Sequence, residues 1–430
     1  MIHRKLFVGC LFASAMLSAE EFEFKPNYDE AKVPEYRLAD PLVCNDGTVV
    51  SSPELWTSKR RPELIRLFET NVYGKAPGKP QSQTAELIEE DQNAFGGIAI
   101  RRQVRLHLEN NGKKHSLDLL IYLPKKNSKG RMFLGLNFGG NHTVHSDPAI
   151  LLPTSWVRTI PGSHAKDNKA SAEDRGWQES RWQVEKVIKA GYGTATTYYG
   201  DIDPDYDDGF QNGVHALFRD GEEWPKDNWG SIAAWAWGLS RIVDYFETDP
   251  ALKSNKVIVH GHSRLGKTAL WAGALDDRFA IVISNDSGCG GAALSVRGFG
   301  ETVGRINRVF PHWFCDNYWK YNENEAACPV DQHELVALSA PRAVYIASAL
   351  NDRWADPKGE FLAGLGADPV YRLFPAGAGG VDVGVESPYM PPVDRPLLNG
   401  RIGYHLRTGS HDITDYDWEQ FVEFADLQLR

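Results

Sequence analysis

The sequence predicts an α/β protein in which a mostly parallel central sheet is covered by helices on both faces. Two observations favour this class. Along most of the chain, short apolar runs typical of buried strands alternate with longer segments whose apolar residues recur at helical spacing. Elements that alternate in this way usually form one sheet of parallel strands between two layers of helices. The chain has 430 residues, 42% of them hydrophobic, so it is long enough to bury such a core.

The expected strands are short, rich in aliphatic and aromatic residues, and bounded by turn-forming residues. They span residues 98–108, 116–123, 132–138, 193–199, 256–260, 280–284, 343–348 and 402–406. Asn110, Asn111 and Gly112 separate the first two and favour a β-hairpin. The third is apolar throughout, as expected of a strand that is buried on both faces. Expected helices span residues 62–73, 182–190, 229–246, 265–275 and 416–429, and residues 377–400, rich in Gly and Pro, are expected to form a surface loop.

Residues 1–19 have the layout of a signal peptide. Arg4 and Lys5 precede an apolar stretch that ends near Leu17, and small residues around Ala19 suit cleavage. Residues 20–95 are polar and interrupted by prolines, and we expect them to wrap around the domain formed by residues 96–430. No later segment is long and apolar enough to span a bilayer. We therefore expect a secreted or periplasmic protein that is soluble and free of the membrane once processed.

The net charge of −10 and the lack of a long basic run argue against nucleic acid as a partner, because phosphate binding needs clustered Lys and Arg. Cleavage after Ala19 would leave four cysteines, whose spacing is too wide for a zinc site. They could form two disulfides in an oxidising compartment or remain free buried thiols. The four are Cys44, Cys289, Cys315 and Cys328.

A candidate nucleophile follows the apolar strand at 256–260. Ser263 lies between Gly261 and Gly266, and a helix is expected to begin directly after it. A strand, a tight turn and a helix in this order form a nucleophile elbow, which exposes the serine hydroxyl at the carboxyl end of the sheet. The second glycine comes one residue later than in the usual G-x-S-x-G pattern. The context nevertheless predicts the α/β-hydrolase fold with Ser263 as nucleophile.

A serine nucleophile needs a histidine base and an acid that orients it, and in this fold they follow the serine in the order acid, then histidine. His411 lies between the last expected strand and the last expected helix, which suits the base. His405 falls within a strand and is expected to lie in the core. Asp286 and Asp352 each follow a strand and obey the chain order, so that both are candidates for the acid. We favour Asp352.

The residues around Ser263 resemble the glucuronoyl esterases, carbohydrate esterase family fifteen, whose elbow reads G-C-S-R-x-G-K with the same late glycine. Here the segment reads Gly-His-Ser-Arg-Leu-Gly-Lys over residues 261–267. The bacterial branch looks closest, because His262 replaces the cysteine of fungal members and so removes their disulfide at this position. Further segments of the resemblance lie at 198–205, 287–294, 310–314, 352–357 and 411–414.

The resemblance implies roles for further residues. Arg264 would stabilise the oxyanion through its backbone N–H and its guanidinium. Lys267, Glu301 and Trp354 resemble the residues that contact the sugar. Many members carry Glu at the position of Asp286, whereas other bacterial members resemble this chain in having an acid after the next strand, where Asp352 lies. We expect the shorter side chain of Asp286 to stop short of His411, which is why Asp352 is favoured.

The family cleaves the ester between 4-O-methyl-glucuronic acid branches of xylan and alcohols of lignin. The resemblance therefore implies a serine esterase whose partner is this glucuronoxylan–lignin ester, acting as a monomer without metal or cofactor. Two other interpretations stay open at this point. One is another carbohydrate esterase such as an acetyl-xylan esterase, and the other is a non-catalytic carbohydrate-binding relative that has kept the fold.

Overall fold

A nine-stranded sheet runs through the part of the chain that the computed structural model describes, which is residues 24–160, 162–221, 224–374 and 389–429. Its order is β1-β2-β3-β5-β4-β6-β7-β8-β9. The strands are β1 (Ser82–Asn93), β2 (Ala99–Asn110), β3 (Lys113–Pro124), β4 (Arg131–Asn137), β5 (Gly193–Tyr198), β6 (Lys256–His262), β7 (Phe279–Asn285), β8 (Ala343–Ala349) and β9 (Ile402–Arg407). β1, β2, β3 and β5 pair antiparallel, and the pairings from β5 through β4 to β9 are all parallel. The mostly parallel sheet of the sequence prediction is confirmed.

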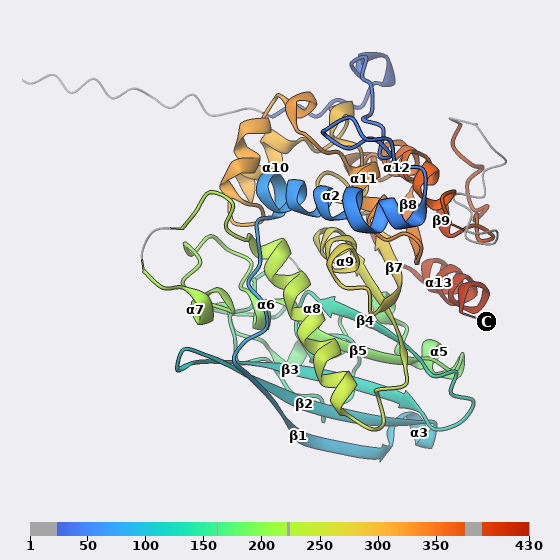
Figure 1. The fold of residues 1–430 in the computed structure, drawn as a ribbon. Helices are drawn as coiled ribbons and strands as arrows, with labels where there is room; N and C mark the ends of the chain where they lie inside the picture. The colour runs from blue at the N-terminus through green and yellow to red at the C-terminus, as the bar shows by residue number, and fades with distance from the viewer. Residues whose placement is uncertain (1–23, 161, 222–223, 375–388, 430) are drawn as a thin grey trace, which may run out of the picture.

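All eight expected strands form, with ends that differ from the prediction by a few residues. The expected hairpin turn joins β2 to β3. β1 was not expected, and the placing of residues 82–93 in a segment that merely wraps around the domain is wrong, because β1 pairs with β2 as the edge of the sheet. Figure 1 shows β1, β2 and β3 together at the bottom of the view. Most side chains of β1 are exposed or half-buried, so the strand lacks the apolar alternation that would predict it.

Two helical layers enclose the parallel strands, as the alternation along each strand shows. In β6, Val257 and Val259 belong to one large core with α8 (Ser231–Thr248), α9 (Arg264–Leu275), α11 (Gln332–Ala337) and α12 (Pro357–Tyr371). Ile258 points to the opposite face and packs in a second core with α5 (Val184–Lys189) and α13 (Asp415–Gln428). Successive side chains of a strand point to opposite faces, so the central strands are buried on both sides. This is the expected three-layer sandwich.

The N-terminal segment is fastened to the first of these layers. The expected helix at 62–73 forms as α2 (Arg61–Phe68) with a π-helical turn at each end, and Figure 1 shows it beside α9 and α11. Arg61 Nη2 donates to the carbonyl of Ala274 in α9 at 2.8 Å, and Arg60 Nη2 donates to Glu334 in α11 at 2.7 Å. The segment therefore contributes to the core as well as covering it.

Three other predictions concern the ends, the loops and the cysteines. The proposed signal peptide and residues 375–388 of the Gly- and Pro-rich loop lie outside the described residues. Within the described ranges, no helix combines the length and apolar character that a membrane span requires. The cysteines named above are all free thiols in the structure, so the open choice is decided in favour of unpaired cysteines.

Candidate active site

The turn after β6 has the geometry of a nucleophile elbow. Ser263 adopts φ 57° and ψ −128°, a conformation that non-glycine residues rarely adopt, and α9 begins at the next residue. A side chain at Gly261 would place its Cβ 1.9 Å from the carbonyl oxygen of Leu265, so only glycine fits beside the first turn of α9. Gly266 lies against Ser287, with 3.0 Å between the site of a Cβ and the Ser287 Cβ. The late glycine of the motif therefore lets α9 approach the loop after β7.

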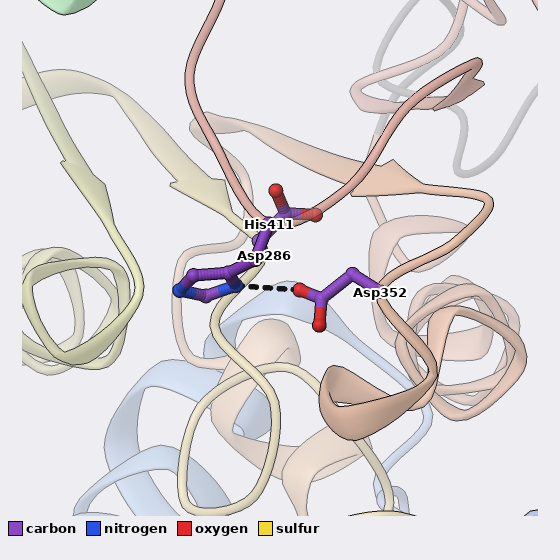
Figure 2. Close-up of side chains that lie close together, drawn as sticks. All are labelled: Asp286, Asp352 and His411. Carbon is purple, nitrogen blue, oxygen red and sulfur yellow. Dashed lines mark hydrogen bonds and ion pairs between the residues drawn. The ribbon is translucent and has the colours of Figure 1, made fainter.

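His411 lies in the loop after β9, and its ring contacts one of the two candidate acids. Nδ1 donates to Oδ2 of Asp352 at 2.6 Å, the hydrogen bond drawn in Figure 2. Asp352 is buried, whereas the His411 side chain is 41% exposed. With Nδ1 engaged by a carboxylate, Nε2 is the ring nitrogen left to accept a proton. This is the arrangement that orients the base of a serine hydrolase.

Asp286 lies close to the same histidine but faces elsewhere. Its Oδ2 accepts hydrogen bonds from Arg407 Nη2 at 3.3 Å and from the backbone N–H of Asp412 at 3.4 Å. Its φ of 44° turns the residue away from the extended conformation of β7. Burial and the neighbouring carboxylates of Glu360 and Asp352 raise the pKa of Asp286 well above its usual range. Of the two predicted candidates, Asp352 is thus the one bonded to His411.

Among the described residues, the two acids and His411 also have oxygen and nitrogen atoms close enough to share a metal ion. One such atom from each residue lies within 4.8 Å of the others. The donor chemistry does not fit a metal well. Nδ1 of His411 is already engaged by Asp352, and the guanidinium of Arg407 faces Asp286. A cation at this point would meet a second positive charge, so the contacts fit the His411–Asp352 pair of a serine hydrolase better than a metal site.

Arg264 is positioned by a buried carboxylate. Its Nη1 donates to Oδ2 of Asp205, which also accepts the Tyr199 hydroxyl at 2.9 Å. The guanidinium stands over the Trp313 ring at 4.6 Å, and its buried Nε has no hydrogen-bond partner. Although burial acts in the opposite direction, the contacts of Asp205 with His312, Arg264 and other cations hold its pKa below the usual range. A fixed guanidinium whose Nε–H has no hydrogen-bond partner thus lies next to Ser263.

Two cavities of about 480 and 420 Å³ meet at this point, and both are lined by Ser263, Arg264 and His411. The smaller one, called the acyl cavity after the sugar contacts that the resemblance implies, is further lined by Lys267, Asp286, Ser287, Gly288, Glu301, Arg305, Val309, Phe310, Trp313, Asp352, Trp354 and Ala355. The larger one, called the alcohol cavity because the resemblance would then place the other half of an ester there, is further lined by Phe138, Arg158, Ile160, Trp177, Gln178, Ser180, Arg181, Tyr199 and His262. A serine at the junction of two cavities suits a substrate with two different halves.

The acyl cavity contains all three residues that the resemblance assigns to sugar contacts. Lys267 is 3% exposed, and its Nζ donates to the carbonyl of Ser287 and lies 3.8 Å from Glu301 Oε2. Burial raises the pKa of Glu301, while Lys267 and Arg264 oppose that rise. Trp354 is half-buried and contacts the Phe24 ring edge-to-face at 5.8 Å. An ammonium group, a carboxyl group and an indole face therefore surround this cavity.

His262 occupies the place of the fungal cysteine and supports the base. Its Nδ1 hydrogen-bonds to Asn285 Oδ1 at 2.5 Å, and its ring lies 4.5 Å from that of His411. Burial, followed by the nearby positive charges, lowers the pKa of His262 well below its usual range. This shift favours the neutral form of the His262 ring, which lies beside the ring of His411.

Sequence reasoning missed two groups of residues at the site. Asp205 belongs to a segment that resembles the family, but nothing local indicates that it binds Arg264. The alcohol cavity is formed mainly by the connection between β4 and β5, which has no regular pattern of apolar residues. The tryptophans of this connection were a signal, and one of them, Trp177, lines the cavity.

Comparisons with known proteins identify the family of the chain. A family model described as "Glucuronyl esterase, fungi" matches residues 222–374. The chain is 53% identical to "Carbohydrate esterase MZ0003" of an unknown prokaryotic organism, over 94% of this chain and 92% of that protein. It is 35% identical to a 4-O-methyl-glucuronoyl methylesterase of Wolfiporia cocos, over 79% of this chain and 73% of that protein.

Solved structures give the same result. A promiscuous esterase of carbohydrate esterase family 15 from a marine bacterial metagenome matches with TM-score 0.86 and 51% identity, over 94% of this chain and 100% of that one. The glucuronoyl esterase of Solibacter usitatus matches with TM-score 0.85 and 44% identity, over 93% of this chain and 100% of that one. The chain therefore belongs to the glucuronoyl esterases of carbohydrate esterase family 15, a family of carboxylic ester hydrolases with the α/β-hydrolase fold.

Proposed function

We propose that this protein is an exported serine esterase that cleaves the ester between 4-O-methyl-D-glucuronic acid of glucuronoxylan and alcohols of lignin. The observation that carries the proposal is the position of Ser263. It lies on a nucleophile elbow beside the His411–Asp352 pair, at the junction of one cavity with sugar-binding chemistry and one with aromatic walls.

In the proposed reaction, Ser263 Oγ attacks the ester carbonyl carbon while His411 Nε2 takes the hydroxyl proton. The tetrahedral intermediate collapses when the bond to the alcohol oxygen breaks and His411 returns the proton to that oxygen. Water then attacks the acyl-serine by the reverse sequence and releases the uronic acid and free Ser263. Asp352 holds the imidazole by its Nδ1 and stabilises the imidazolium that forms in both steps.

Arg264 supplies the positive charge for the oxyanion. Its backbone N–H opens α9, and the first N–H groups of a helix have no partner within the helix. Its side chain adds the unused Nε–H of a guanidinium held by Asp205. A preorganised donor set of this kind contributes about 3–4 kcal/mol to transition-state stabilisation in other serine hydrolases.

The acyl cavity suits a uronate sugar. Esterification removes the negative charge of the uronate, so an acidic protein does not repel it. Lys267 and Glu301 offer a donor and an acceptor for ring hydroxyls, and Trp354 offers an aromatic face. The alcohol cavity contributes the rings of Phe138 and Trp177, which suit an aromatic alcohol.

The sequence supports export of the enzyme through residues 1–19, to the periplasm or the medium. We further propose that the processed chain acts as a monomer without cofactor. Mass spectrometry of the purified protein, at its N-terminus and in its native state, tests both statements.

Initial rates on a panel of esters test the function. We expect release of free acid from benzyl and methyl glucuronate by the parent, and none by Ser263→Ala. Activity on acetyl-xylan with none on glucuronate esters would instead identify a deacetylase. Binding of xylan with no hydrolysis of any ester would identify a carbohydrate-binding relative, and full activity of Ser263→Ala would overturn the nucleophile.

A further inference from the structure

Arg407, the last residue of β9, lies buried beneath the loop that carries His411. It is 2% exposed and is surrounded by acceptors on several segments. Nη2 donates to the carbonyl of Ser410 at 3.1 Å and to that of Asp412 at 2.5 Å. Nη1 donates to the carbonyl of Thr408 at 3.2 Å. One nitrogen therefore holds the backbone on both sides of His411.

The guanidinium of Arg407 is itself fixed by Asp417 of α13. Its Nε faces both carboxylate oxygens of Asp417, at 2.9 and 3.1 Å. Asp417 is fully buried in α13 and also accepts hydrogen bonds from His405 at 2.9 Å and from the backbone N–H of Thr414 at 2.6 Å. A planar guanidinium with its Nε engaged has little freedom to rotate. The loop carbonyls are thus tied to the central sheet and α13 through one rigid group.

The loop has a residue that permits this close approach. Gly409 adopts φ +115°, and a Cβ built on it would lie 2.8 Å from Arg407 Nη1. The carbonyl of the same glycine accepts the backbone N–H of Asn351 at 2.9 Å, next to Asp352. The loop of the base is thereby fastened both to Arg407 and to the loop of the acid.

Arg407 also engages the second carboxyl group near His411. Its Nη2 lies 3.3 Å from Asp286 Oδ2, while His411 bonds to Asp352. We propose that Arg407 is a positioning residue for catalysis: it sets the loop 408–412 so that His411 meets Asp352, and it keeps Asp286 turned away. This inference rests on the proposed role of His411 as the base.

The test measures kcat and KM of Arg407→Ala on benzyl glucuronate, with the folded fraction determined by circular dichroism. Arg60→Ala is the matched control, because Arg60 is equally buried and ion-paired but its partners Glu63 and Glu334 line neither cavity. A misplaced catalytic group loses about 100-fold in rate. We expect that loss in the kcat of folded Arg407→Ala, with KM within about twofold of the parent, and no comparable loss for Arg60→Ala. Guanidinium ion below denaturing concentration should restore part of the kcat of Arg407→Ala.

Two further variants keep the result decisive. Gly409→Ala leaves the charge of Arg407 in place but moves the loop 408–412 away from the guanidinium, so its kcat should also fall. If Arg407→Ala does not fold, the kcat of Gly409→Ala tests the inference instead. His411→Ala removes the proposed base and should be inactive with or without guanidinium.

A parent-like kcat in folded Arg407→Ala, or in Gly409→Ala, would overturn the inference. The proposed function would still stand in that case if His411→Ala is inactive. Equal losses in Arg407→Ala and Arg60→Ala would reduce Arg407 to a structural role, and an active His411→Ala would overturn the proposed function itself.

Discussion

The two cavities that meet at Ser263 are built from different parts of the fold. The acyl cavity is lined by residues that follow β6, β7 and β8, together with buried charged groups such as Lys267 and Asp286. The alcohol cavity takes most of its lining from the single long connection between β4 and β5, including the exposed Trp177. Residues at the ends of strands are fixed in position because the strands are packed in the core. The sequence of a surface connection can change without disturbing the sheet.

The difference indicates how specificity is divided. Under the proposed function, the acyl half of the substrate would contact groups that follow the central strands, and the alcohol half would contact mainly the connection between β4 and β5. Variants in one cavity should therefore discriminate among acids, variants in the other among alcohols, and variants at the junction should affect every ester alike.

The largest effect is expected at the junction. Asp352→Asn should lower kcat by about 10⁴ on methyl and benzyl glucuronate equally, because the imidazole loses the acid that orients it. Asp286→Asn is the matched control and should retain most of the activity, since that carboxyl faces Arg407. Steady-state kinetics on both esters measures this. The opposite ranking of the two variants would make Asp286 the acid, and unequal losses on the two esters would contradict a shared centre.

The next effect concerns the wall of the acyl cavity. Glu360 of α12 accepts the backbone N–H groups of Ser287 and Gly288 at 2.8 and 2.9 Å, and its burial raises its pKa from 4.5 to about 7. Because the pKa of Glu360 is higher in the folded than in the unfolded chain, the native state binds more protons. The stability that protonated Glu360 contributes is therefore complete below pH 4.5 and is lost as the pH rises through 7. Glu360→Gln should therefore gain stability relative to the parent between pH 4.5 and 8, by at most about 3 kcal/mol.

Urea unfolding at the two pH values measures that gain. Asn307→Ala removes a partly buried hydrogen bond to Asn322 without removing a titrating group, so its difference from the parent should not change with pH. The same pH dependence in Glu360→Gln and the parent would show that Glu360 keeps its charge throughout.

A smaller effect is expected inside the acyl cavity. Lys267→Met retains the length of the side chain but removes its charged donor, which is worth about 10- to 100-fold in kcat/KM if it binds the sugar. The loss should be the same for methyl and benzyl glucuronate. Lys189→Met, on the exposed face of α5, is the control. A loss of kcat/KM that differs between the methyl and benzyl esters would mean that Lys267 contacts the alcohol rather than the sugar.

The smallest effect is expected in the alcohol cavity. Trp177→Ala should raise KM for benzyl glucuronate by about fivefold, the value of one aromatic contact of roughly 1 kcal/mol, and leave methyl glucuronate unchanged. Trp319→Ala removes an indole that is similarly exposed but lines neither cavity, and serves as the control. Equal changes on both esters would mean that Trp177 supports the site rather than the alcohol.

The elbow, the strands and the base could be predicted from the sequence because their signals are local. Gly261, Ser263 and Gly266 lie within six residues, and the apolar runs before and after them define a strand and a helix. His411 follows from chain order and from its place between the last expected strand and the last expected helix. Such features depend on neighbours in the chain, which a single sequence displays.

The choice between Asp352 and Asp286 depends on contacts that the sequence does not display. Both residues follow a strand, and they are separated by the hydrogen bond of Asp352 to His411 and by the contact of Asp286 with Arg407, 121 residues away. Asp205 likewise acts on Arg264 across 59 residues. β1 was missed for a different reason: an edge strand exposed on both faces carries no periodic apolar pattern.

The backbone at Ser263 has a consequence for the evolution of the fold. A non-glycine residue at φ 57° and ψ −128° costs about 1–3 kcal/mol, and the rest of the structure must impose it. Glycine accepts these angles without that strain, so a chain with glycine at this position would be more stable and catalytically dead. Selection for thermal robustness alone would therefore favour glycine at position 263, whereas the proposed role as nucleophile requires serine.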